Sequence, residues 1–162
     1  MTSVSVKPTL VYTTYIASTQ DRVWQAIVDP ELARQYWIGN DPKSPARVNV
    51  SDWEAGSTWE HRRDDETRQV DISGTVLESD PPRKLVISWA RPKEMDDPSK
   101  HSRVTFELES LNETLVKIIV IHDDIEKDPA MLNGVSSGWP RVLSNLKTFL
   151  ETGRALPQNR IA

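Results

Sequence analysis

The sequence predicts an α+β domain in which a long C-terminal helix closes a curved antiparallel sheet of about six or seven strands. Three observations lead to this fold class. Short segments rich in β-branched and aromatic residues follow one another through the middle of the chain, without a long helical pattern between them. Two short helical patterns follow the first such segment, and a long amphipathic pattern comes near the C-terminus.

The N-terminal part is predicted to form a strand followed by two short helices. Residues 9–17 contain neither glycine nor proline and favour a strand. Ser18 is expected to cap the first helix, whose apolar residues recur at spacings of three and four. Asp29 and Pro30 are expected to end it and to begin the second helix, because aspartate caps helices and proline is tolerated at the first helical position. Gly39 is expected to end the second helix.

A series of strands is expected after these helices, separated by turn residues. The strands are residues 46–51, 57–63, 69–79, 84–90, 102–109 and 114–123. The last two are expected to pair as an antiparallel hairpin, with Val104 and Phe106 turned toward the terminal helix. The segment 114–123 is apolar on both faces, so Ile119 and Ile121 are expected to be covered by neighbouring structure or by a second subunit.

The terminal helix has the clearest pattern in the chain. Its apolar residues at helical spacing are Trp139, Val142, Leu143, Leu146, Phe149 and Leu150. Pro140 is expected in its first turn and Gly153 just beyond its last. Residues 1–8 and 154–162 are expected to be loose, which leaves 9–153 as a single domain.

Composition excludes several classes of protein. The absence of cysteine excludes a disulfide framework and a thiolate metal site, and it favours a reducing compartment. The first residues do not resemble a secretory signal, so the cytoplasm is the expected location. The net charge of -4 argues against a nucleic-acid partner, and no segment approaches membrane-spanning length. No cofactor is expected, because the sequence lacks phosphate-binding and dinucleotide motifs.

Three stretches resemble a known superfamily. They are residues 16–24, residues 28–32 with Tyr36 and Trp37 behind them, and residues 138–140 leading into the terminal helix. On these stretches, from about Leu10 to Gly153, the chain resembles the START-like (SRPBCC) helix-grip superfamily of lipid carriers and birch-pollen-allergen-like proteins. Within it the chain is similar to the C-terminal domain of the activator of the heat-shock-protein-90 ATPase. The resemblance implies the helix-grip fold, and the superfamily includes chaperone partners, hydrophobic-ligand carriers and cyclases.

Two histidines are candidates for polar groups in the space under the helix. Alternation along the strand from Ser57 places Trp59, His61 and Arg63 on one face, which is expected to be the inner one. His61 is then a polar anchor, an acid/base group or simply a hydrogen-bonded core histidine. His122, at the end of the apolar strand, is a second candidate at the mouth of the cavity. No histidine pair has the spacing of a metal site, so no metal is expected.

The candidate ligand-binding residues lie on elements expected to face that space. They are Trp37, Trp59, His61, Trp89, Phe106, His122, Trp139 and Leu143. The first function class is binding of a small apolar or aromatic ligand in a cavity of roughly 300–1,000 Å³. The second is a cyclase- or hydrolase-type enzyme that uses a pocket histidine, and the third is a chaperone-interacting domain. The sequence names no catalytic residue, and a homodimer is possible.

Overall fold

A computed structural model describes residues 7–39 and 41–158. These residues form one seven-stranded sheet with three α-helices and three short 3-10 turns. The elements are β1 (Leu10–Ile16), α1 (Gln20–Val28), α2 (Pro30–Tyr36), β2 (Arg47–Ser51), β3 (Thr58–Arg63), β4 (Val70–Asp80), β5 (Lys84–Trp89), β6 (Ser102–Asn112), β7 (Leu115–Asp123) and α3 (Pro129–Thr152). The predicted α+β class is confirmed. Most of the two segments expected to be loose, residues 1–6 and 159–162, lies outside the described residues.

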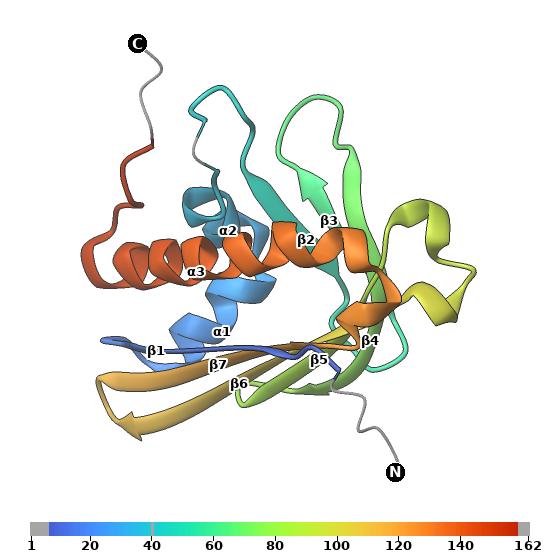
Figure 1. The fold of residues 1–162 in the computed structure, drawn as a ribbon. Coiled ribbons are helices and arrows are strands. Elements are labelled where there is room, and N and C mark those ends of the chain that lie inside the picture. The colour runs from blue at the N-terminus through green and yellow to red at the C-terminus, as the bar shows by residue number, and fades with distance from the viewer. Residues whose placement is uncertain (1–6, 40, 159–162) are drawn as a thin grey trace.

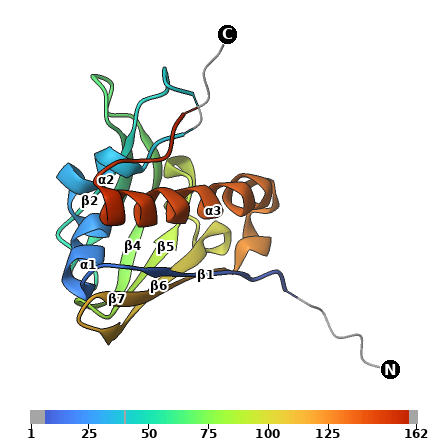
Figure 2. The ribbon, with the colours of Figure 1, turned by 90° about the vertical axis from the view of Figure 1, so that its left-hand side faces the viewer.

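The sheet is antiparallel throughout, in the order β1-β7-β6-β5-β4-β3-β2. Helix α3 lies across its concave face, with α1 and α2 behind the C-terminal half of α3 (Figure 1). Seen from the side, β1, β6 and β7 run beneath α3 while β2 rises beside it, so the sheet wraps around the helix (Figure 2). Buried apolar side chains fill the space between them. No helix in the described part of the chain is both long and apolar enough to cross a membrane.

Side-chain caps determine where the two short helices begin. The hydroxyl of Thr19, not that of Ser18, accepts a hydrogen bond from the backbone N–H of Arg22, so the predicted cap was one residue early. Asp29 caps α2 as predicted, with Pro30 at the first helical position. Helix α2 ends at Tyr36, before Gly39, because the backbone leaves the helical conformation at residue 37.

The predicted hairpin of β6 and β7 is confirmed. Val104 pairs with His122 and Phe106 with Val120, and both β6 side chains are buried toward α3. Strand β1 pairs with the other edge of β7, so β7 is central, which accounts for its apolar character. On the outer face, Ile119 and Ile121 are half-buried within this chain.

Helix α3 begins well before the predicted start, at Pro129, and Pro140 lies inside it. A proline has no N–H for the carbonyl four residues earlier, here that of Ser136. The hydroxyl of Tyr12 on β1 donates to that carbonyl across 3.1 Å, and this contact between distant segments replaces the missing helical bond. At the other end Gly153 adopts the left-handed conformation, with φ of 80°, and ends the helix as predicted.

Candidate functional site

Four tryptophans from four different elements meet under the N-terminal half of α3. Trp37 follows α2, Trp59 lies on β3, Trp89 on β5 and Trp139 on α3, and all four are buried. Ring centroids are 5.4 Å apart for Trp59 and Trp89, 5.6 Å for Trp89 and Trp139, and 6.0 Å for Trp37 and Trp139. Tilted and edge-on aromatic pairs at these separations stabilise one another beyond simple burial. The inner face of the sheet is therefore largely packed rather than open.

A small pocket remains between these rings and α3, with a volume of about 150 Å³. Its lining consists of Trp37, His61, Trp89, Gly134, Val135, Gly138, Trp139 and Val142. Gly134 and Gly138 lie one helical turn apart, and nothing stands within 4 Å of the position that a Cβ atom would occupy on either. The pocket is smaller than the expected 300–1,000 Å³, because the indole rings fill most of the concave face.

The eight predicted site residues are all buried, but the structure divides them into two groups. Trp37, His61, Trp89 and Trp139 line the pocket. Trp59, Phe106, His122 and Leu143 pack in the core and do not line it. Sequence reasoning missed the lining residues on the first turns of α3, because the helix was expected to begin near Pro140. The pair of glycines four residues apart was the available signal.

His61 has one nitrogen bound and one free. Its Nδ1 lies 2.7 Å from Oδ1 of Asn49, whose amide nitrogen donates to the carbonyl of Ile27 across 3.1 Å. The amide orientation therefore makes Nδ1 the protonated nitrogen, and Nε2 keeps its lone pair. Nε2 hydrogen-bonds none of the described residues. Burial and, to a smaller extent, the charge of Arg47 lower the pKa of His61 to about 4 against the opposing charge of Asp71, so the ring is neutral at pH 7.

His122, in contrast, uses both of its nitrogens in a chain of buried hydrogen bonds. The indole N–H of Trp139 donates to Nδ1 across 3.1 Å, so Nε2 carries the proton and donates to Oγ of Ser102 across 2.8 Å. The Ser102 hydroxyl donates in turn to the carbonyl of Trp89 across 3.2 Å. Burial lowers the pKa of His122 to about 4, against the opposing charge of Asp123. A serine paired with a protonated nitrogen cannot lose its proton to it, so this pair is structural.

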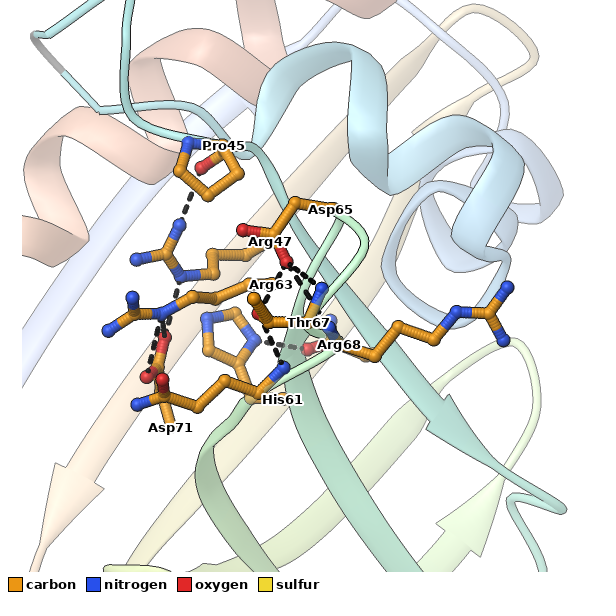
Figure 3. Close-up of polar contacts among 10 residues, drawn as sticks. Pro45, Arg47, His61, Arg63, Asp65, Thr67, Arg68 and Asp71 are labelled. Carbon is orange, nitrogen blue, oxygen red and sulfur yellow. Dashed lines mark hydrogen bonds and ion pairs between the residues drawn. The ribbon is translucent and has the colours of Figure 1, made fainter.

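A charged cluster lies beside His61 on the inner face of β2, β3 and β4 (Figure 3). Arg47 and Arg63 stand opposite each other in the strand register, and the next pair on that face is Asn49 and His61. The register of β3 against β4 shifts between His61 and Arg62, a bulge that turns Asp71 onto the same face. Asp71 accepts from Nε of Arg47 at 2.8 Å and from Nε of Arg63 at 3.2 Å. We call Arg47, Arg63 and Asp71 the arginine rim.

No metal site accompanies these groups in the described ranges, 7–39 and 41–158. There, no three or more His, Cys, Asp or Glu side chains lie close enough together to hold a metal ion.

Comparison with known proteins identifies the family. Residues 17–151 match the family described as activator of Hsp90 ATPase homolog 1-like protein. The chain belongs to this family. No match was found among curated proteins.

Several solved structures share the fold of this chain. ChR145 from Cytophaga hutchinsonii is 25% identical, with 91% of this chain and 96% of that chain covered and a TM-score of 0.66. The Aha1 dimer from Colwellia psychrerythraea is 17% identical, with coverages of 91% and 99% and a TM-score of 0.68. PFC0360w, described as an HSP90 activator from Plasmodium falciparum, is 18% identical, with coverages of 88% and 95% and a TM-score of 0.66. The last two likenesses show the fold alone.

Proposed function

We propose that the protein binds a small apolar or aromatic molecule in the pocket between the sheet and α3. The observation that carries this proposal is an apolar space walled by Trp37, Trp89 and Trp139, into which Gly134 and Gly138 place no side chain. A cavity of about 150 Å³ with apolar walls accommodates a ring the size of benzene. Several aromatic faces around such a space favour an aromatic ligand, because offset and edge-on ring contacts add to apolar burial.

The test is to fill the pocket without disturbing the fold. In Gly138→Val the new side chain enters open space, whereas in the control Ser137→Val the same side chain is added on the exposed face of the same helix. Titration with phenol, indole and toluene should change the tryptophan fluorescence of the parent and of Ser137→Val but not that of Gly138→Val. A parent protein that responds to none of these compounds, and that carries no small molecule in native mass spectrometry, would refute the proposal.

A second candidate function, proton transfer on the bound molecule, is supported by the free Nε2 of His61. Its lone pair is available at neutral pH, and Asn49 holds the ring in one orientation. If the parent protein converts a bound ligand, the His61→Gln variant should still bind that ligand but should no longer convert it. A ligand bound by the parent and released unchanged would support binding alone. The chaperone-interacting role rests only on the description of the family and on the names of distant structures, and we do not propose it.

We also propose a homodimer formed through the outer face of β1 and β7. Val11 and Tyr15 on β1 are 57% and 47% exposed, and Val11 stands beside the half-buried Ile121. Apolar side chains gathered on an otherwise polar surface favour association, and one structural neighbour is described as a dimer. Sedimentation should show twice the monomer mass for the parent and a monomer for Val11→Glu. A monomeric parent at high concentration would contradict this proposal.

A cytoplasmic location is proposed on compositional grounds. The chain contains no cysteine that an oxidising compartment would pair. Fractionation of cells that express the protein at its natural level would test it, and recovery outside the cytoplasmic fraction would refute it.

A further inference from the structure

We propose that the molecule bound in the pocket is a small aromatic carboxylate, and that Arg47 and Arg63 bind its anionic group while its ring enters the pocket. This inference rests on the proposed function, since it names the chemical class of the ligand for the same pocket. It is carried by the position of the arginine rim, by its charge and by the donors that it leaves free.

The strand register places the rim next to the pocket. Arg47 and Arg63 form the pair adjacent to Asn49 and His61 on one face of the β2–β3 hairpin, and His61 is part of the pocket wall. The backbone N–H of Arg47 donates to the carbonyl of Trp37 across 2.9 Å, which joins the rim to a second wall residue. An elongated ligand seated against His61 and Trp37 therefore has guanidinium groups within reach of one of its ends.

The rim carries an excess of positive charge. Two guanidinium groups share the single carboxylate of Asp71, so the three side chains sum to one positive charge. The three side chains are between 23% and 36% exposed, so a ligand can reach them, and water screens them less than fully exposed groups. Among the described residues, Arg47 is the one rim residue whose side chain makes a hydrogen bond outside the rim: one of its terminal nitrogens donates to the carbonyl of Pro45.

Two further carboxylates lie near the rim, and each has hydrogen-bond or ion-pair partners of its own. Asp64 pairs with Arg34 on α2. The carboxylate of Asp65 accepts hydrogen bonds from Thr67 and from the backbone of Arg68, within its own loop. The hydrogen bond from Thr67 lowers the pKa of Asp65, and the charge of Arg63 adds a smaller effect in the same direction. Figure 3 shows Arg47 and Arg63 extending side by side toward Asp71, whereas the side chain of Arg68 points away from them. Neither acid supplies a hydrogen bond to the terminal nitrogens of Arg63 among the described residues.

The geometry of the donors favours a carboxylate. A guanidinium group presents parallel N–H donors in a plane, which matches the two oxygens of a carboxylate. Asp71 occupies Nε of each arginine and leaves the terminal nitrogens of Arg63 for a second carboxylate. A pocket of about 150 Å³ accepts a single aromatic ring, and the anionic group of the proposed ligand then extends past His61 toward the rim.

The experiment compares acids with their uncharged counterparts of the same shape. Benzoate, phenylacetate and 3-phenylpropionate are each titrated beside the corresponding primary amide, with tryptophan fluorescence as the readout. For the acid of best-fitting length, the parent should bind the acid roughly tenfold more tightly than the amide, the usual effect of a charged hydrogen-bonding partner. Arg63→Gln should abolish that preference without weakening amide binding, and added salt should reduce it in the parent.

The matched control is Arg62→Gln. Arg62 immediately precedes Arg63 on β3, but it points to the other face and pairs with Glu60. This variant should retain the full preference for the acid. Amides that bind as tightly as the acids, or a preference that persists in both Arg63→Gln and Arg47→Gln, would overturn the inference and leave the proposed function intact. A parent that binds phenol, indole or toluene but neither acids nor amides would overturn the inference alone, whereas a parent that binds none of these compounds and carries no small molecule would overturn the proposed function itself.

Discussion

The indole N–H of Trp139 donates to Nδ1 of His122 across 3.1 Å, and this bond places the proton of a buried histidine on its other nitrogen. His122 therefore donates to Ser102 and accepts nothing from it. We predict that long-range ¹H–¹⁵N NMR spectra at pH 7 will show His122 as the Nε2–H form and His61 as the Nδ1–H form. The opposite form at His122 would reopen a base role for that residue.

Replacement of Trp139 separates its packing from its hydrogen bond. Trp139→Ala removes a buried ring and should lower the free energy of unfolding by about 3–5 kcal/mol. Trp139→Phe keeps a ring but leaves Nδ1 of His122 without a donor, which should cost about 1–3 kcal/mol more than its loss of packing. Trp24→Phe is the control, since the indole N–H of Trp24 hydrogen-bonds no described residue. Equal losses in urea unfolding for the two Phe variants would contradict this.

Stability should fall as the pH is lowered from about 6.5 toward 4. Burial depresses the pKa of both His61 and His122 to about 4, below the value of 6.5 that an unfolded chain has. The unfolded state therefore binds more protons in this range, and each histidine can contribute up to about 3 kcal/mol of lost stability. Urea unfolding at pH 7.5, 6 and 5 measures the loss. NMR titration that gives either histidine an ordinary pKa would contradict the prediction.

Replacement of Gly74 and of Gly134 by alanine should change the free energy of unfolding in opposite directions. A Cβ atom on Gly74 would stand 2.0 Å from the carbonyl oxygen of Ser88 and 2.6 Å from Nε1 of Trp59, which donates to that same carbonyl. Gly74→Ala should therefore lower the free energy of unfolding by about 3 kcal/mol or more. Gly134→Ala, in open space within α3, should raise it by up to about 1 kcal/mol. Comparable unfolding midpoints for the two variants would contradict this.

The hydroxyl of Tyr12 should matter only because Pro140 is a proline. Tyr12→Phe removes the donor to the Ser136 carbonyl and should cost about 1 kcal/mol. In a Pro140→Ala background the backbone N–H of residue 140 can donate a hydrogen bond to that carbonyl, so the cost of Tyr12→Phe should largely disappear. A double-mutant cycle by urea unfolding measures the coupling, and additive effects would show that the hydroxyl has another role.

The sequence by itself determined the order of elements and the direction of side chains within them. The alternation of Trp59 and His61, and of Val104 and Phe106, predicted which side chains turn inward, and all four are buried. The caps at Asp29 and Gly153 were also readable, because capping depends on residues adjacent in the chain. Local patterns in the sequence were therefore enough to predict the fold class and to name Trp37, His61, Trp89 and Trp139, four of the eight residues that line the pocket.

Only the tertiary structure decided where α3 begins and what each histidine does. A proline inside a helix is tolerated here because Tyr12, on a distant strand, supplies the missing donor. His61 and His122 both lie on inner faces, and each has a partner at Nδ1, Asn49 and Trp139 respectively. Among the described residues only His122 has a second partner, Ser102, at Nε2. The pocket is small because tryptophans from four elements converge on one space. Such contacts depend on the three-dimensional positions of residues far apart in the chain, which no local pattern encodes.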